Sequence, residues 1–264
     1  MAYRSVWKGF LKLALVTCPV ILYRATAEAD DLKLTQFNRQ TGNRIEYQRI
    51  DSETGADVGK EDIANGVEVA TGRYAEVTNE EIAGVAPRSA LVLDIVELVP
   101  PAGIAWLFPD GHYYLGPDGM AAETAFAVLR AAVARSDLVA IGQLTLGRRE
   151  HIVALTPGEK VFALSTLRYG AEVRSEEDCF PKLAGLAADP KLVASMQKLV
   201  AARARSAFDP ARFGDRYRAA LAELVRDKIG GKMVSAKPVR PPKLMDLEKA
   251  VARSVMALRG TRVA

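Results

Sequence analysis

Two kinds of apolar spacing divide this chain. Between residues 5 and 175, short runs rich in β-branched and aromatic residues alternate with Gly, Pro and Asn, as β-strands and turns do. The runs 150–155 and 161–167 flank Pro157-Gly158 as the arms of a hairpin would. Many short strands at turn spacing predict a barrel or a sandwich.

Helical spacing interrupts this pattern twice and then replaces it. Thr78 and Glu81 have capping-box spacing before a short helix, and 121–135 predicts a second helix with one apolar face. From Lys191 onward the apolar positions recur every three to four residues, with a break at Pro210 and an end at Gly230-Gly231. The predicted fold class is therefore α+β, mainly β, with a strand-rich body over 1–190 and a helical region over 191–231.

The last segment, 232–264, combines a basic, Pro-containing linker with an amphipathic tail. Residues 237–242 read Lys-Pro-Val-Arg-Pro-Pro, a composition typical of an extended linker. The following apolar stripe consists of Leu244, Leu247, Val251, Val255 and Leu258. Such a helix packs back on the body, docks a partner, or lies on a membrane surface, and the sequence leaves these three interpretations open.

Charge is distributed unevenly along the chain. The 264 residues carry a net charge of +4, but from Lys198 onward sixteen Lys and Arg face six Asp and Glu, whereas twenty face twenty-six upstream. This step from about −6 to +10 indicates a basic region that seeks a polyanion, either nucleic acid or an anionic membrane. A basic terminus that only keeps the protein soluble is the plainer alternative.

Catalytic and metal-binding motifs are missing from the sequence. It has no phosphate-binding Gly-rich loop and no paired-His motif, and Cys18 and Cys179 are too far apart to suggest a disulfide framework. The cysteine spacing predicts no Cys-based metal site, the missing motifs give no sign of a cofactor, and no uncharged apolar run approaches the length of a membrane span. A magnesium nuclease would need converging carboxylates, for which Asp118 and Asp189 are the nearest match.

Sequence-independent DNA binding requires Arg and Lys side chains directed at phosphates from a rigid surface. The predicted strands carry candidates at Arg44, Arg49, Arg148, Arg149 and Arg168. The planar guanidinium suits phosphate better than a point charge does. For each arginine, a surface ion pair with a neighbouring carboxylate is an equally good interpretation.

Several segments, taken in order, resemble one family. They are Trp7-Lys8-Gly9 with 19–26, Gly66 to Tyr74 with Thr78-Asn79-Glu80-Glu81, 147–151 (Gly-Arg-Arg-Glu-His), Leu164 to Arg174, Phe208-Asp209-Pro210 with 215–218, and Leu221 to Lys232. Together they resemble the bacterial Ku proteins. This resemblance implies a homodimeric ring that threads onto double-stranded DNA ends without reading sequence, protects them, and recruits an ATP-dependent DNA ligase for non-homologous end joining. On this resemblance we expect no enzyme activity, no cofactor and no metal, in a protein of the cytoplasm that associates with the nucleoid. A DNA-end nuclease and a nucleoid-type architectural protein remain the alternatives.

The resemblance also implies roles for particular residues. A bridge that arches over DNA is expected at about 30–85, within the 1–190 core, with DNA contacts from Lys33, Arg39, Arg44, Arg49, Lys60 and Arg73. Arg148 and Arg149 match a basic pair near the DNA channel, and the tail adds Lys237, Arg240 and Lys243. Many family members carry cysteines in the bridge that suggest a zinc knuckle, but Thr41, Asp51 and Thr54 stand at those positions here. Another departure is Ile21, where Lys is frequent.

Overall fold

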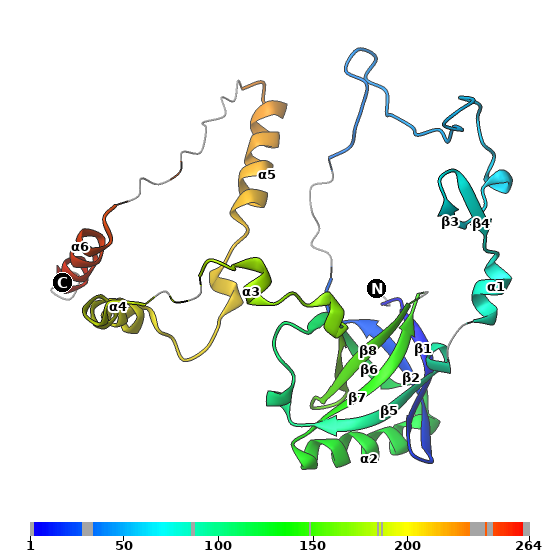
Figure 1. The fold of residues 1–264 in the computed structure, drawn as a ribbon, viewed down its shortest axis with the longest axis horizontal. Coiled ribbons are helices and arrows are strands. Elements are labelled where there is room, and N and C mark those ends of the chain that lie inside the picture. The colour runs from blue at the N-terminus through cyan, green and yellow to red at the C-terminus, as the bar shows by residue number, and fades with distance from the viewer. Residues whose placement is uncertain are drawn as a thin grey trace. The chain divides into compact units, whose positions relative to one another are not determined.

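Seven strands close into a β-barrel in the computed structural model, which describes residues 3–27, 34–85, 88–147, 149–183, 185, 187–232, 241 and 245–260 (Figure 1). The strands are β1 (Trp7–Leu13), β2 (Val16–Arg24), β5 (Val92–Val99), β6 (Pro109–Pro117), β7 (Val139–Leu146), β8 (Arg149–Pro157) and β9 (Phe162–Leu167). They follow the order β1-β2-β6-β9-β8-β7-β5, and β5 closes the barrel by pairing parallel with β1. The predicted mainly β fold and the 150–167 hairpin are confirmed.

Alternation along the strands fills the barrel with aliphatic side chains. Leu11, Leu22, Leu115 and Leu155 are completely buried, because every second residue of a strand faces the interior. The helix α2 (Met120–Ser136) packs on this core with the apolar face that the sequence predicts. Phe126 of α2 meets Phe162 edge to face, with ring centroids 5.6 Å apart.

The strand directions give the barrel two unlike rims. At one of them β2, β7 and β9 end while β1, β5, β6 and β8 begin. The chain leaves the barrel after Arg24 and returns at Val92, and both residues lie at this rim, which we call the excursion rim. The helix α2 connects the end of β6 to the start of β7, so it belongs to the opposite rim.

The excursion between β2 and β5 has little regular structure. It contains the 3₁₀ helix η1 (Lys60–Asp62), the two-stranded sheet of β3 (Gly66–Ala70) and β4 (Arg73–Glu76), α1 (Asn79–Gly84) and the 3₁₀ helix η2 (Arg88–Ala90). Thr78 and Glu81 form the predicted capping box. The prediction of strands over 34–65 is wrong, since the described residues there form only the isolated bridges Phe37 to Arg44 and Ile50 to Asp57. Each bridge closes a tight turn and has no neighbouring strand to extend it.

Polar contacts fasten the returning chain to the barrel. The Trp7 indole nitrogen donates to the Ala90 carbonyl oxygen at 2.8 Å. The buried Ser89 hydroxyl lies 2.8 Å from the Thr145 hydroxyl and donates to the Glu150 carboxylate. The end of the excursion is therefore fixed to β7 and β8.

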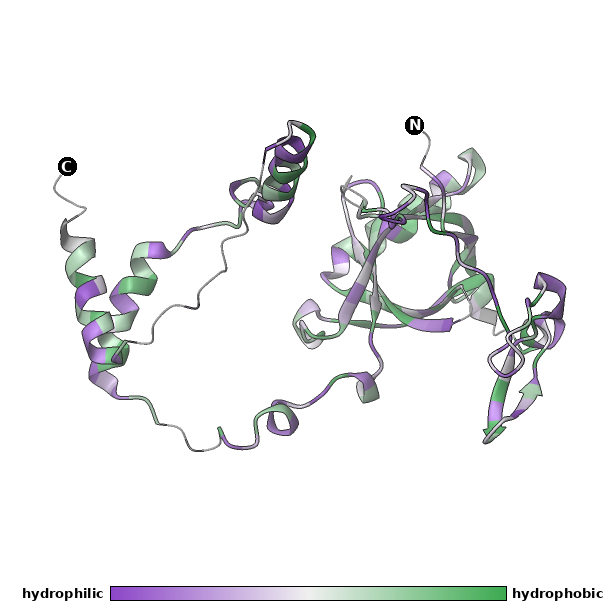
Figure 2. Cartoon of the chain, turned by 90° about the horizontal axis from the view of Figure 1, so that it is seen from above, coloured by the Kyte–Doolittle hydropathy of each residue, from purple (hydrophilic) through white to green (hydrophobic). Residues whose placement is uncertain are grey.

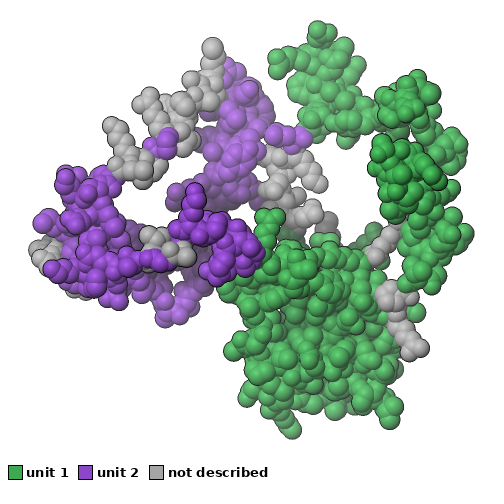
Figure 3. All heavy atoms as spheres, in the orientation of Figure 1, with its two compact units in different colours: residues 1–29, 35–174 green, residues 30–34, 175–264 purple. Residues whose placement is uncertain are grey.

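The remaining helices belong to a second compact unit, residues 30–34 with 175–264, separate from the unit of residues 1–29 with 35–174 (Figure 3). They are α3 (Glu176–Cys179), α4 (Pro190–Arg203), the 3₁₀ helix η5 (Pro210–Arg212), α5 (Arg216–Ile229) and α6 (Leu247–Gly260). The barrel unit also holds the 3₁₀ helices η3 (Pro101–Gly103) and η4 (Gly170–Glu172). Proline and glycine delimit α4 and α5 as predicted.

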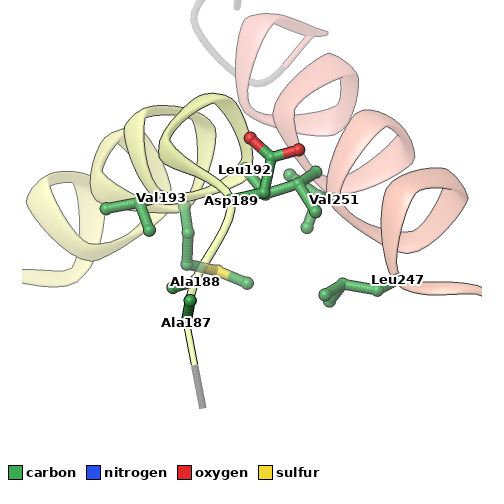
Figure 4. A pocket seen from close by; sticks show the side chains of 8 residues that line it. Ala187, Ala188, Asp189, Leu192, Val193, Leu247 and Val251 are labelled. Atoms are coloured by element: carbon green, nitrogen blue, oxygen red, sulfur yellow. The ribbon is translucent and has the colours of Figure 1, made fainter. Parts of the chain in front are cut away.

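The amphipathic stripe of α6 faces α4. Val251 is 4% exposed and lines an open pocket of about 420 Å³ with Leu192, Val193 and Leu247 (Figure 4). The described part of α6 thus packs on α4, a helix of its own unit, whereas packing on the strand-rich body, partner docking and membrane contact stay predictions. No described helix is both long and apolar enough to cross a membrane.

Candidate nucleic-acid interface

The excursion exposes apolar side chains along its whole described length. None of its residues between 34 and 85 whose side chain is described is buried. Side chains that are at least 60% exposed include Phe37, Tyr47, Ile50, Val67, Val69 and Tyr74, and the β3–β4 hairpin shows hydrophobic segments next to hydrophilic ones in Figure 2. A two-stranded hairpin is at best marginally stable alone. A surface of this kind marks a site of interaction.

In the excursion, several acidic side chains form hydrogen bonds within the segment, whereas the basic side chains have no ion-pair partner among the described residues. Residues 34–85 hold five Lys and Arg against ten Asp and Glu, so the segment is net negative. Several carboxylates hold its own structure: Glu68 accepts from the Gly72 amide at 3.0 Å, and Asp57 accepts from Gln48 at 2.7 Å. The five cations Arg39, Arg44, Arg49, Lys60 and Arg73 are exposed and make no ion pair with any described residue.

Two turns with similar hydrogen bonds, at 38–42 and 51–55, contain the positions at which the family resemblance leads us to expect the cysteines of a zinc knuckle, namely Thr41, Asp51 and Thr54. In the second, the Asp51 carboxylate accepts from the Glu53 and Thr54 amides at 3.0 and 2.8 Å and from the Thr54 hydroxyl. The amide of Gly55 (φ +68°) donates to the Asp51 carbonyl oxygen. The Thr54 amide, followed by the Thr54 hydroxyl and the Glu53 amide, lowers the pKa of Asp51.

The first turn repeats these contacts thirteen residues earlier. The Asn38 side-chain oxygen accepts from the Gln40 and Thr41 amides, and the amide of Gly42 (φ +75°) donates to the Asn38 carbonyl oxygen. Gly42 and Gly55 adopt the left-handed backbone conformation that each turn requires, at little cost in steric strain. Hydrogen bonds thus close both turns, and the described residues contain no cluster of three or more His, Cys, Asp or Glu side chains suited to a metal ion.

A second group of charges lies at the excursion rim. Arg149 begins β8 and forms an ion pair with Glu172, and its guanidinium carbon lies 5.9 Å from the centre of the Tyr169 ring. Arg168, which directly follows β9, pairs with Asp110 at 2.8 Å. The Arg149 guanidinium and the Tyr169 amide lower the pKa of Glu172, and Glu172 raises that of Arg149. The ion-pair interpretation therefore applies to Arg149 and Arg168, whereas Arg44 and Arg49 have no such partner among the described residues.

Comparison with known proteins decides the family. The family model described as Ku70/Ku80 beta-barrel domain matches residues 12–196. The chain belongs to the Ku family. Curated relatives named non-homologous end joining protein Ku include one from Bradyrhizobium sp., 38% identical over 89% of this chain and 80% of the relative. Those from Methylocella silvestris and Allorhizobium ampelinum are 37% and 33% identical, over 86% and 96% of this chain and 84% and 92% of theirs.

A solved structure, the SPOC domain of human PHD-finger protein 3, covers 62% of the chain and 95% of its own at a TM-score of 0.31 and 8% identity, which is too low to add to the argument. Membership in the Ku family is consistent with a barrel interrupted between its second and third strands. The chain leaves the barrel after Arg24 and returns at Val92, on either side of the residues, about 30–85, for which the bridge is predicted, and the bridging role stays a prediction.

The candidate DNA contacts fall into two groups. Seven have described positions: Arg39, Arg44, Arg49, Lys60 and Arg73 in the excursion and Arg149 and Arg168 at the rim. Five lie outside the described residues: Lys33, Arg148, Lys237, Arg240 and Lys243. The carboxylates suggested for a nuclease have other partners, since Asp118 pairs with Lys8 at 3.1 Å and Asp189 caps α4. Sequence reasoning missed Tyr169 and Glu172, although both lie in the motif 164–174.

Proposed function

We propose that this chain forms a homodimeric ring that threads onto the ends of double-stranded DNA without reading sequence and protects them. One observation carries the proposal: the excursion leaves and rejoins the barrel at one rim, and its five cations are exposed with no ion-pair partner among the described residues, while several of its carboxylates hold its own backbone. Such cations bind phosphates, which supply affinity without sequence information. The names of the curated relatives point to the same process, non-homologous end joining.

Exposed apolar side chains in the excursion support the homodimer. One chain covers neither face of the β3–β4 hairpin, because Val67, Val69 and Tyr74 are all largely exposed. A second copy offers the same surface, and a twofold interface is self-complementary by nature. Two barrels and two excursions then enclose a duplex. Enclosure converts weak phosphate contacts into topological retention and makes loading depend on a free end.

The helical region supports the recruitment of an ATP-dependent DNA ligase. Both α4 and α5 keep exposed apolar side chains, among them Val200, Tyr217 and Ile229. Exposed apolar residues on helices fit docking to a partner protein better than contact with DNA. We assign most of the ligase docking to 192–232 and non-specific DNA contact to the basic tail. The chain itself acts without catalysis, in the cytoplasm and on the nucleoid.

A competition experiment tests the proposal. Labelled linear duplex is bound at two salt concentrations, and unlabelled linear DNA or a relaxed, covalently closed circle of equal mass competes. Linear DNA should compete far better, and binding should weaken steeply with salt. Equal competition by the circle would instead favour an architectural protein. Cleavage of either DNA by the pure protein with magnesium would favour a nuclease.

A further inference from the structure

Arg149 is the one cation, among those of the candidate interface that the structure describes, that lies beside both a carboxylate and an aromatic ring. The register of β8 and β9 pairs Ile152 with Leu167, so the chain beyond Leu167 runs alongside the start of β8. There the Tyr169 hydroxyl donates to the Glu150 carbonyl oxygen at 3.1 Å. This bond fixes the Tyr169 ring against the strand that carries Arg149.

Glu172 is held independently of the arginine. One carboxylate oxygen accepts from the Tyr169 amide at 2.9 Å, and the Glu172 amide donates to the Tyr169 carbonyl oxygen across η4. The other oxygen accepts from Arg149 Nη2. Because a backbone amide anchors the carboxylate, Glu172 sets the position of the guanidinium rather than following it. The Glu172 side chain is 33% exposed and that of Arg149 is 58% exposed.

The guanidinium keeps most of its donors free. An arginine has five N–H donors, and among the described residues Glu172 is the only hydrogen-bond partner of this one. Its remaining donors lie at the excursion rim. A guanidinium with one edge on a carboxylate and one face near an aromatic ring has lost much of its rotational freedom, so binding a phosphate costs less entropy.

We propose that Glu172 and Tyr169 are positioning residues that hold Arg149 in place for a DNA phosphate. This inference rests on the proposed DNA-end binding. The positioning effect of Glu172 on DNA affinity is thus opposite in sign to its direct electrostatic effect. Its carboxylate repels phosphate, yet removing the carboxylate is expected to weaken DNA binding. A plain electrostatic role predicts the opposite sign, because losing a negative charge near DNA strengthens binding.

The test is a double-mutant cycle with a matched control. Dissociation constants for a short blunt duplex are measured for the unmodified protein, Glu172→Gln, Arg149→Gln and the double variant. Asp110→Asn is the control, since it removes a carboxylate that also pairs with a rim arginine, Arg168. An exposed ion pair contributes little to stability, so we expect all variants to fold, which thermal melting checks.

Glu172→Gln should weaken binding about fivefold, as when a charge-assisted hydrogen bond becomes a neutral one. The double variant should bind no more weakly than Arg149→Gln alone, because Glu172 acts only through Arg149. Asp110→Asn should leave binding unchanged or tighten it. Tyr169→Leu, measured in the same way, should also weaken binding, because it removes the ring that lies beside Arg149.

Two results would overturn the assignment: a Glu172→Gln variant that binds as tightly as the unmodified protein or more tightly, or losses that multiply in the double variant. Should Glu172→Gln fail to fold, unchanged binding by Tyr169→Leu overturns it equally. Failure of the proposed function looks different, since the unmodified protein would then not distinguish linear from circular DNA.

Discussion

Removing charge from the excursion gives the sharpest test of the DNA-binding surface. Arg44, Arg49 and Arg73 are exposed and unpaired among the described residues, so replacing all three by Gln removes cations without breaking a contact that holds the fold. We expect a folded dimer that binds DNA ends weakly. Replacement of the same three residues by Glu should abolish end binding, because the new charges repel phosphate.

The size of the effect follows from counterion release. Three cations in each subunit make six in a dimer, and if each neutralises one phosphate, the slope of log affinity against log salt falls by about five. Doubling the salt should then weaken the unmodified protein about fortyfold more than the variant.

Fluorescence anisotropy on a short blunt duplex across a salt series measures both slopes. Arg135→Gln is the control, since Arg135 is exposed on α2 at the opposite rim and its loss should leave the slope unchanged. Equal slopes for the triple variant and the unmodified protein would refute the reasoning and move the phosphate contacts elsewhere.

Three further predictions concern the tail, the turns and acid. Replacing Lys237, Arg240 and Lys243 by Gln should make the salt slope shallower and reduce ligase-dependent end joining only in part; an unchanged slope would show that the tail does not touch DNA. Elemental analysis of the purified protein should find no stoichiometric zinc, because Thr41, Asp51 and Thr54 replace the expected cysteines. The pKa values of Asp51 and Glu81 are lowered in the fold, so both carboxylates stabilise their turn and cap above their unfolded pKa values of about 4. That stability should be lost as pH falls through the lower folded values, seen as falling protection factors of the Thr54 and Thr78 amides, each taken against the intrinsic exchange rate at the same pH, and protection factors that stay constant would contradict the assignment.

Sequence periodicity predicted the barrel well and the excursion poorly. Strands and α2 bury one face each, so spacing alone reveals them, as Phe126, Leu129 and Val133 illustrate. Residues 34–65 bury nothing, and hydrogen-bonded turns decide their conformation instead. The Asn38 and Asp51 turns share the spacing Asx-x-x-Thr-Gly, a repeat that the sequence displays and that strand patterns do not detect.

The rim site was predicted in part. Arg149 followed from a family resemblance, but its two neighbours were not expected to act on it. Tyr169 and Glu172 approach Arg149 only because β8 and β9 pair in one register, and a linear motif does not state which strands will meet. The ion pair of Arg168 with Asp110 likewise joins residues 58 positions apart in the chain.

The excess of acid in the excursion bears on the kinetics of association. A segment with ten carboxylates and five cations does not attract a polyanion over long distances, however well its arginines fit a phosphate at close range. Long-range attraction must come from the basic region that begins at Lys198, whose sixteen cations face six carboxylates. The two regions would then govern different rate constants, with the C-terminal region accelerating encounter and the excursion slowing dissociation.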